Sequence, residues 1–264
     1  MIIAGLQRNT LIDYPGKIAC VVFLAMCNFR CPWCYSSELV LPLKIANQPR
    51  ILEQDFFNFL KERKGLLEGV VICGGEPTIN KDLPNFIEKI KQLGFFVKLD
   101  TNGSNPEMLK DLVRAGFVDY VAMDIKGPVG PNFKFSFDAS RRIPRRVLFN
   151  FQSNPNDQIK KTVYEKIIGE GVKIEDIVES VKFLKSGAVD FEFRTTCVPG
   201  VHQKEDFLQI ADWIGGENVK YYLQSFRAEK TIDPEFEKVK PFQEEYLKEI
   251  AKEISPYFKV CQLR

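Results

Sequence analysis

Short apolar runs alternate with amphipathic stretches along most of the chain. The first apolar run, 18–24, is typical of a buried strand, and in the stretch after it Phe56, Phe59 and Leu60 share one helix face. The remaining predicted strands are 70–72, 95–99, 120–123, 190–195 and 220–223. The predicted helices are 53–64, 83–93, 106–115, 174–184, 205–214 and 242–254. A final apolar run at 258–263 fits an added strand.

Alternating strands and helices indicate βαβ units around a parallel sheet. The pattern supplies six such units, fewer than the eight of a complete barrel. We therefore predict an α/β fold, a partial and open (β/α)6 barrel in a single domain spanning 1–264. Two segments lie outside the repeats. An irregular insertion at about 130–163 is basic, with arginines at 141, 142, 145 and 146, and a helix and strand extension covers 235–264.

Composition narrows the class of protein. The 264 residues are 45% hydrophobic and 27% charged, with a net charge of +2, which is ordinary for a soluble globular chain. So small a net charge argues against a dedicated nucleic-acid or membrane-surface binder. No apolar run reaches the ~20 residues that span a bilayer. The longest run, 18–27, lacks the basic flank and small-residue cleavage site of a signal peptide, so we expect a cytoplasmic protein.

Three of the seven cysteines lie together directly after the first predicted strand. Cys27, Cys31 and Cys34 have the spacing C-x3-C-x2-C, and thiolates select zinc, copper(I) or iron–sulfur clusters. A structural zinc site normally has four protein ligands, and a cubane held only by protein uses four cysteines. Three ligands would leave one iron of a [4Fe–4S] cluster open to a substrate or cofactor. A structural metal with a distant fourth cysteine is the alternative. We expect His202, the one histidine, at the surface where a helix begins.

Polar motifs follow four further predicted strands, and in β/α barrels the chemistry gathers at those strand ends. The motifs are Gly74-Gly75-Glu76-Pro77, Asp100-Thr101-Asn102-Gly103, Met123-Asp124-Ile125-Lys126, and the fifth-strand residues Arg194 and Val198. The two glycines allow close backbone approach to a ligand, and the Glu76 carboxylate can meet an ammonium group. Asp100 and Asp124 suit ribose hydroxyls or a small cation, or they serve as loop caps.

The C-x3-C-x-aromatic-C arrangement, with Trp33 as the aromatic residue, resembles the radical S-adenosylmethionine superfamily. Together with the opening segment 11–17 and the strand-end motifs, the chain looks like the anaerobic ribonucleoside-triphosphate reductase activating proteins, relatives of the pyruvate formate-lyase activating enzymes. The likeness runs from residue 1 to about 225. It departs at Tyr35, where many members have histidine, at Gln224, where pyruvate formate-lyase activases carry a histidine, and at the longer insertion.

The resemblance implies a radical SAM core domain with a [4Fe–4S] cluster on the three cysteines. It also implies S-adenosyl-L-methionine, and a monovalent cation near Asp100 and Asp124. The implied cofactor contacts are Trp33, Tyr35, Gly74, Gly75, Glu76, Pro77, Asp100, Thr101, Asn102, Asp124, Ile125, Lys126, Arg194 and Val198. Reductive cleavage of the cofactor would give a 5′-deoxyadenosyl radical, which takes a hydrogen atom from a glycine of a partner glycyl radical enzyme. A flavodoxin- or ferredoxin-like protein would supply the electron, and no general acid or base is required.

Two other interpretations remain open. The same cluster and cofactor motifs would suit a radical enzyme acting on a small molecule, a nucleoside or RNA, for example one similar to deazaguanine synthases. The insertion has no recognised RNA-binding motif, and we expect it to dock a protein partner because it is basic and follows the fourth strand. A non-enzyme, either an iron–sulfur carrier or a zinc-stabilised binding module, would instead need a fourth protein ligand.

Overall fold

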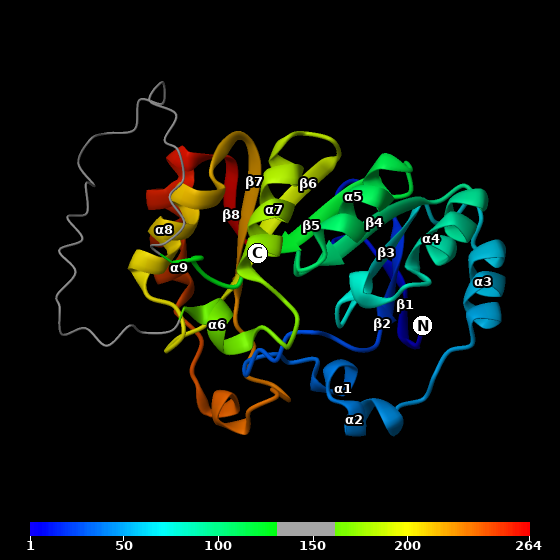
Figure 1. Ribbon diagram of the computed structural model, residues 1–264, viewed down its shortest axis with the longest axis horizontal. Helices are drawn as coiled ribbons and strands as arrows, with labels where there is room; N and C mark the ends of the chain where they lie inside the picture. The colour runs from blue at the N-terminus through cyan, green and yellow to red at the C-terminus, as the bar shows by residue number, and fades with distance from the viewer. Residues whose placement is uncertain (131–161) are drawn as a thin grey trace.

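One sheet organises the fold, and its strands lie side by side in chain order, β1 to β8 (Figure 1). The computed structural model describes residues 1–130 and 162–264. Within those residues the strands are β1 Ile3–Thr10, β2 Ala19–Leu24, β3 Gly69–Gly74, β4 Phe96–Thr101, β5 Tyr120–Asp124, β6 Asp190–Cys197, β7 Gly216–Ser225 and β8 Phe258–Leu263. Neighbours from β2 to β8 run parallel, and β1 pairs antiparallel with β2.

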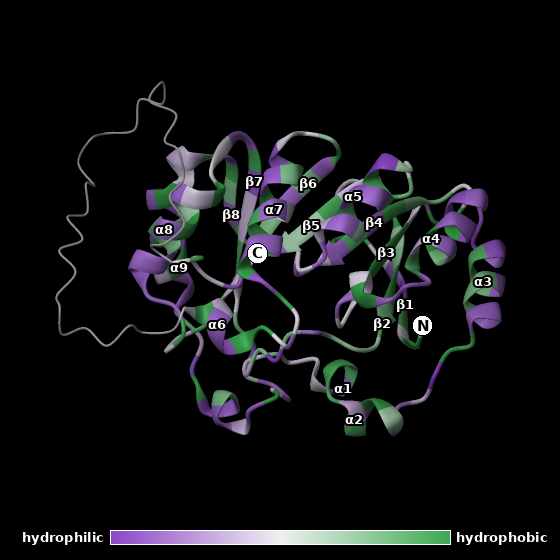
Figure 2. Ribbon diagram, in the orientation of Figure 1, coloured by the Kyte–Doolittle hydropathy of each residue, from purple (hydrophilic) through white to green (hydrophobic). Residues whose placement is uncertain are grey.

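Helices follow the parallel strands. They are α1 Ser37–Val40, α2 Pro42–Ala46, α3 Glu53–Glu62, α4 Leu83–Gln92, α5 Pro106–Arg114, α6 Val163–Ile167, α7 Ile174–Lys185, α8 Lys204–Ile214 and α9 Glu244–Ile254. Short 3-10 turns are η1 Pro77–Ile79, η2 Pro234–Lys238 and η3 Ser255–Tyr257. Polar and apolar residues alternate within the longer helices, as Figure 2 shows. In α4, for example, Leu83, Phe86, Ile87 and Ile90 are buried, as the helical period requires.

The prediction of an α/β partial barrel in one domain is confirmed. The six predicted strands correspond to β2–β7, and the run at 258–263 is β8, which pairs with β7. Strand β1 was not predicted. Its burial pattern lacks a regular two-residue period because three successive residues, 7–9, are exposed, so the sequence carries little strand signal there. Residues 131–161, most of the predicted insertion, lie outside the described residues.

Alternate residues of the strands point to opposite faces of the sheet, and two separate clusters result. Cys20, Val22 and Ile72 belong to the large cluster that includes the helices. Val21 and Val71, of the opposite parity, pack on the other, inner face with Tyr14 and Tyr120. None of the helices in the described ranges combines the length and apolarity needed to cross a bilayer.

Tyr14 closes the inner face at the end where the parallel strands begin. Its ring lies 6.1 Å from the ring of Tyr120, and a Cβ added to Gly69 would come within 3.0 Å of it. Only 3% of Tyr14 is exposed, so the segment between β1 and β2 contributes a core side chain. The polar groups Asp100, Asp124 and Arg194 lie at the opposite end of the barrel, where the parallel strands end.

We predict that Tyr14→Ala lowers the free energy of unfolding by about 3 to 5 kcal/mol, because it removes a buried ring and leaves a cavity. Tyr14→Phe keeps the ring and its contacts, so it should cost less than about 1 kcal/mol. Denaturant unfolding of the three proteins measures both values. Equal stability of Tyr14→Ala and wild type would show that the ring does not support the barrel.

Candidate functional site around the cysteine loop

The three clustered cysteines lie on the cysteine loop, residues 25–36, between β2 and α1. Its residues form no helix or strand apart from an isolated bridge at Phe29. All three cysteines are free thiols, and Cys31 is buried while Cys27 and Cys34 are partly buried. Because the loop cannot pair its own peptide groups in regular structure, its shape depends on neighbouring segments.

The end of β3 holds the start of the loop through the backbone. Gly75 N–H donates to Leu24 O, and Glu76 N–H donates to Met26 O, each over 2.8 Å. Met26 has a positive φ of 79°, which is uncommon for a residue with a side chain. A Cβ on Gly75 would lie 1.9 Å from Met26 O. The glycines of this motif are therefore needed for close approach to the loop backbone, a reason the sequence did not reveal.

Two segments far along the chain fasten the rest of the loop. We name residues 162–169 the first clamp: Arg30 N–H donates to Ile167 O over 2.8 Å, and Gly169 N–H donates to Asn28 O over 2.9 Å. Figure 1 shows α6 of this clamp beside the loop that precedes α1. A Cβ on Gly169 would lie 2.4 Å from Asn28 O, so this position also requires glycine.

Residues 230–236, the second clamp, hold the other half of the cysteine loop. Ile232 N–H donates to Cys34 O over 3.1 Å, and Asp233 N–H donates to Pro32 O over 2.9 Å. The Trp33 ring packs against Phe236, with centroids 6.2 Å apart. Trp33 is 5% exposed, so its indole is a core group of the loop. Sequence reasoning missed both clamps because neither contains a cysteine, a carboxylate motif or a glycine-rich run.

The expected surface position of His202 is wrong, because 2% of this residue is exposed. Its Nδ1 accepts the N–H of Val198 over 3.0 Å, so its Nε2 carries the proton and donates to Lys126 O over 2.9 Å. Its ring meets that of Trp33 edge-on, with centroids 6.2 Å apart. The short loop before α8 turns the imidazole inward, which a helix-start pattern does not indicate.

Glu76 is fully buried and accepts four hydrogen bonds. Its Oε1 accepts the Thr78 N–H, the Thr78 hydroxyl and the Thr101 hydroxyl, and its Oε2 accepts the Asn102 N–H over 2.6 Å. Burial raises the pKa of this carboxyl, and the hydrogen bonds offset part of that rise. Its side chain therefore joins the ends of β3 and β4. Asn102 continues the network by donating to the Asn28 Oδ1 of the cysteine loop over 3.0 Å.

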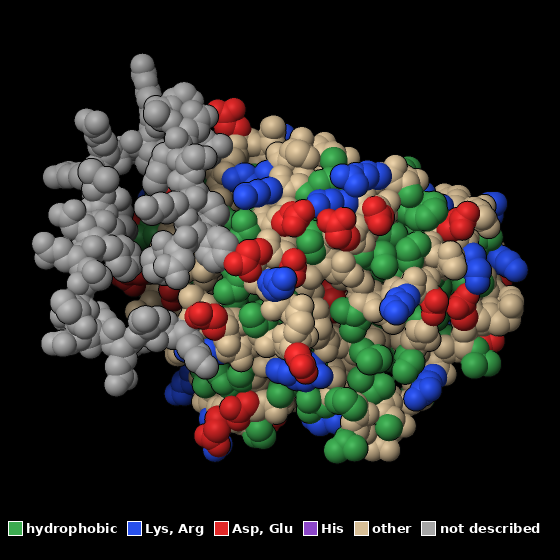
Figure 3. Space-filling view, in the orientation of Figure 1, with side chains coloured by type: hydrophobic (Ala, Val, Ile, Leu, Met, Phe, Trp, Pro, Cys, Tyr) green, Lys and Arg blue, Asp and Glu red, His purple; other side chains and the backbone are tan. Residues whose placement is uncertain are grey.

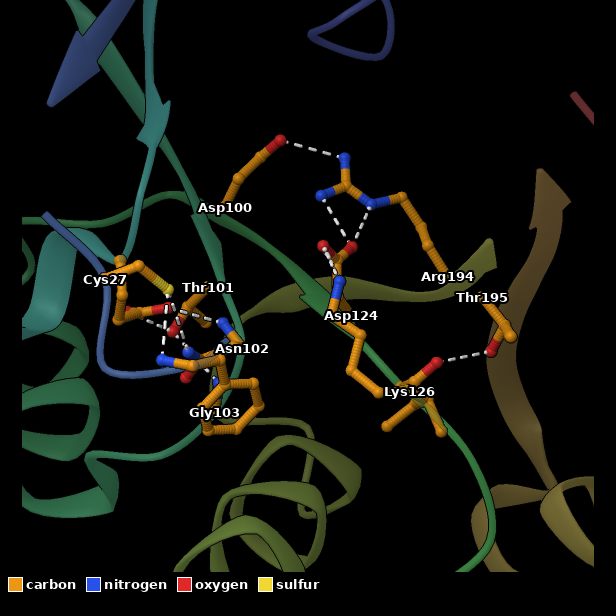
Figure 4. A network of polar contacts seen from close by, with 12 residues as sticks. Cys27, Asp100, Thr101, Asn102, Gly103, Asp124, Lys126, Arg194 and Thr195 are labelled. Carbon is orange, nitrogen blue, oxygen red and sulfur yellow. Dashed lines mark hydrogen bonds and ion pairs between the residues drawn. The ribbon is translucent and has the colours of Figure 1, made fainter. Parts of the chain in front are cut away.

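Asp100 and Asp124 end β4 and β5 on the inner face and share the guanidinium of Arg194 from β6 (Figure 4). Arg194 Nη1 lies 2.8 Å from Asp100 Oδ2, and its Nε and Nη2 each lie 2.9 Å from Asp124 Oδ1. Lys98 donates to the other Asp100 oxygen, and Lys126 donates to the other Asp124 oxygen over 3.0 Å. Burial alone would raise the pKa of Asp124, but Arg194 and Lys126 lower it to about 2.

This arrangement gives no support to a monovalent cation between the two aspartates. Each of their four oxygens already faces a cationic side chain, and three cations stand against two carboxylates. An excess of positive charge in a partly buried place favours an anion instead. The aspartates are neither simple loop caps nor free ligands.

Other predicted site residues differ in exposure. The side chains of Ile125 and Val198 are fully buried, so only their main chains can take part in binding, while Pro77 is buried within η1. Tyr35, which is 53% exposed, follows Cys34 and is available to a ligand. The structure therefore places Asn102 beside Cys27 and Asn28 of the cysteine loop, and it joins Asp100, Asp124, Lys126 and Arg194 in one charged network.

Comparison with known proteins decides the family. A family model described as the radical SAM superfamily matches residues 21–129. A protein of Methanocaldococcus jannaschii, provisionally named a glycyl-radical enzyme activating enzyme, is 31% identical over 257 residues, which cover 97% of this chain and 92% of the relative. The chain belongs to the radical SAM superfamily. It is accordingly a radical SAM enzyme.

Further radical SAM relatives share smaller parts or only the fold. The 7-carboxy-7-deazaguanine synthase of Thermococcus kodakarensis is 29% identical over 128 residues, 42% of this chain and 50% of that protein. The crystal structure of SuiB from Streptococcus suis aligns with a TM-score of 0.60 and 12% identity, covering 92% of this chain and 48% of SuiB. The chain thus spans about half the length of SuiB, and this likeness supports the partial barrel alone.

Radical SAM membership implies a [4Fe–4S] cluster and S-adenosyl-L-methionine, and the residues present fit both. Cys27 Sγ accepts the N–H of Phe29 over 3.3 Å, the kind of hydrogen bond that tunes cluster thiolates. Burial raises the pKa of Cys27 and Cys31 to about 12, so a metal must displace their protons. Among the described residues no three His, Cys, Asp or Glu side chains could hold one metal ion. A cubane does not need such convergence, because each thiolate binds a different iron.

We predict that Gly169→Ala lowers the iron and sulfide content after anaerobic reconstitution about twofold or more, because the new Cβ displaces the Asn28 carbonyl from the first clamp. Gly5→Ala is the matched control, since its Cβ would meet only the Phe23 side chain, at 3.3 Å. Far-UV circular dichroism checks that both variants fold. Full cluster content in Gly169→Ala would show that the first clamp does not hold the loop.

Burial lowers the pKa of His202 below its usual 6.5. The unfolded chain then takes up a proton on this imidazole at a higher pH than the folded chain does. We therefore predict that the free energy of unfolding falls as the pH drops below about 6.5, and that His202→Gln removes this part of the dependence. Unfolding of both proteins between pH 5 and 8 measures the difference. Parallel curves would contradict the buried, neutral imidazole.

Proposed function

We propose that this protein activates a glycyl radical enzyme by removing a hydrogen atom from a backbone glycine of that partner. The observation that carries the proposal is the match to the M. jannaschii relative, which is 31% identical over 97% of this chain and 92% of that protein. Likeness to the T. kodakarensis synthase covers 42% of the chain. The longer match includes the parts of the barrel where a substrate has to be recognised.

The cluster and cofactor would be held by residues around the cysteine loop. Cys27, Cys31 and Cys34 are the three cluster ligands. When bound, the reduced cluster supplies the electron that cleaves S-adenosylmethionine to methionine and the 5′-deoxyadenosyl radical. The cations of Lys126 and Arg194 suit the carboxylate of the cofactor, because their network carries an excess of positive charge. Glu76 orders the ends of β3 and β4, beside which the cofactor would bind.

Hydrogen-atom abstraction needs no general acid or base from the protein, and the histidine is not placed to act as one. The single histidine of the sequence has both ring nitrogens engaged with backbone groups in the core, and it cannot exchange a proton with a substrate there. For the radical reaction, the protein has to orient the cofactor and the substrate and to keep water away from them. The fixed cysteine loop and the buried network would do both.

Exposed apolar side chains beside the cysteines also support a protein substrate. Met26 and Tyr35, which flank the cysteine cluster, are 52% and 53% exposed, and they offer apolar contacts to an incoming peptide. Figure 3 shows basic and acidic side chains interspersed on the visible face, which offers no broad basic patch to a nucleic acid there. A flavodoxin- or ferredoxin-like protein is the electron donor that we propose.

A small-molecule radical reaction is the second candidate function. It is favoured by the likeness of part of the chain to 7-carboxy-7-deazaguanine synthases, 29% identical in T. kodakarensis and 32% identical over 111 residues in Neisseria meningitidis. In that case the polar inner face around Arg194 would bind the substrate beside the cofactor.

The origin of the abstracted hydrogen separates the two candidates. We predict that the reconstituted enzyme, with S-adenosylmethionine and a partner carrying deuterated glycine, transfers deuterium into 5′-deoxyadenosine and gives a glycyl radical signal by electron paramagnetic resonance. Cys27→Ala, Cys31→Ala and Cys34→Ala should each abolish 5′-deoxyadenosine formation, because the cluster loses a ligand. Deuterium transfer from a labelled deazaguanine precursor, and none from glycine, would replace activation with small-molecule chemistry.

A further inference from the structure

Lys126 lies just beyond the point where the sheet stops supporting β5. The last main-chain bond with β6 is from Ile125 N–H to Arg194 O, over 2.7 Å. The peptide groups of Lys126 are instead satisfied by two side chains. Its N–H donates to the Tyr164 hydroxyl over 3.0 Å, and its carbonyl accepts the Nε2–H of His202 over 2.9 Å. The two side chains come from α6 and from the loop before α8, which both follow Lys126 in the sequence, and they bind its N–H and its carbonyl respectively.

The same two rings contact the cysteine loop. Tyr164 meets Phe29 edge-on, with centroids 6.4 Å apart and an interplanar angle of 77°. His202 meets Trp33 edge-on, at 6.2 Å and 71°. Phe29 lies between the first and second cysteines of the motif, and Trp33 lies between the second and third. Each interval of the motif is thus joined to the main chain of Lys126 through one aromatic side chain.

Both side chains are held rigidly. Tyr164 is fully buried and His202 is 2% exposed, so neither can change rotamer without disturbing the core. The Val198 N–H fixes the tautomer of His202, because it occupies Nδ1 and leaves the proton on Nε2. Moving either ring would leave a partly buried peptide group of Lys126 without its partner, which costs more than the net strength of the hydrogen bond itself.

The position of Lys126 matters because this residue joins the two parts of the site. Its Nζ lies 3.0 Å from Asp124 Oδ2, within the network of Arg194. Its main chain is tied to the cysteine loop through Tyr164 and His202, whose rings contact Phe29 and Trp33. A shift of this peptide would therefore move a cation relative to the cysteines.

We propose that Tyr164 and His202 form a positioning pair, which holds the main chain of Lys126 from both sides and fixes its ammonium group relative to the three cysteines. The pair sets the place of the cation that receives the carboxylate of S-adenosylmethionine. This inference rests on the cofactor binding assigned to Lys126 in the proposed function, and it does not depend on which molecule donates the hydrogen atom.

The test uses the reconstituted full-length enzyme without any partner. Tyr164→Phe removes the acceptor for the Lys126 N–H and keeps the ring on Phe29. His202→Asn keeps an acceptor for the Val198 N–H and is too short to reach the Lys126 carbonyl. His202→Gln is the conservative variant, since its amide can still donate to that carbonyl. Tyr120→Phe is the matched control, because it removes a buried tyrosine hydroxyl that bonds Glu192 on another part of the barrel.

We expect Tyr164→Phe and His202→Asn to keep the wild-type iron and sulfide content and to raise the dissociation constant for S-adenosylmethionine about five- to tenfold. Titration of the cofactor-induced change in the paramagnetic resonance signal of the reduced cluster measures this constant. His202→Gln and Tyr120→Phe should stay within about twofold of wild type. In the double variant the dissociation constant should rise by less than the product of the two single effects, because both bonds hold the main chain of one residue.

Several results would overturn the positioning pair. One is an unchanged dissociation constant in Tyr164→Phe and His202→Asn. Another is an equal loss in Tyr120→Phe, which would indicate a general effect of deleting a buried hydroxyl. A third is a lower cluster content with an unchanged dissociation constant for S-adenosylmethionine in the molecules that keep their cluster. That result would mean that the pair only stabilises the cysteine loop. If the pair passes this test but glycine deuterium is not transferred to 5′-deoxyadenosine, only the proposed protein substrate fails.

Discussion

Main-chain hydrogen bonds from distant segments determine the shape of the cysteine loop. The loop has almost no regular structure, so its peptide groups find partners at the end of β3 and in the first and second clamps. A buried peptide group left without a partner costs roughly 1–3 kcal/mol, so these bonds cannot be given up singly without consequence. The clamps belong to parts of the chain that follow β5 and β7. The ligand geometry therefore forms only when nearly the whole barrel has folded.

The charged groups on the inner face obey a second constraint. Carboxylates in a poorly solvated place must be paired, and Asp100 and Asp124 are paired with side chains of the same sheet. Arg194 joins β4, β5 and β6 through one planar guanidinium, which can bond two carboxylates at once. The pairing leaves one cation in excess, so the network is ready for an anionic group and has no vacant oxygen for a metal ion. The excess positive charge therefore lies at the ends of β4, β5 and β6, which are neighbours in the sheet.

Local patterns in the sequence were sufficient for most elements and insufficient for their contacts. The helix at 83–93 was predictable because its apolar residues recur at the helical period, and the strand at 120–123 because it is a short, continuous apolar run. Glu76 was recognisable as a site residue, but its four donors come from η1 and the end of β4, which only the folded chain brings together. His202 was placed at the surface because one polar residue before a helix carries no information about the direction of its side chain.

The shape of the cysteine loop and the position of the nearby cation depend on different kinds of atoms. The loop shape depends on main-chain atoms, so glycine is required where backbones meet, as at Gly75 and Gly169, and the identities of the intervening side chains are less constrained. The position of the nearby cation depends on side chains instead, through Tyr164 and His202. A barrel can therefore change the exposed residues around its cysteines, such as Met26 and Tyr35, without altering cluster geometry. Substrate choice and radical generation can then vary independently within one fold.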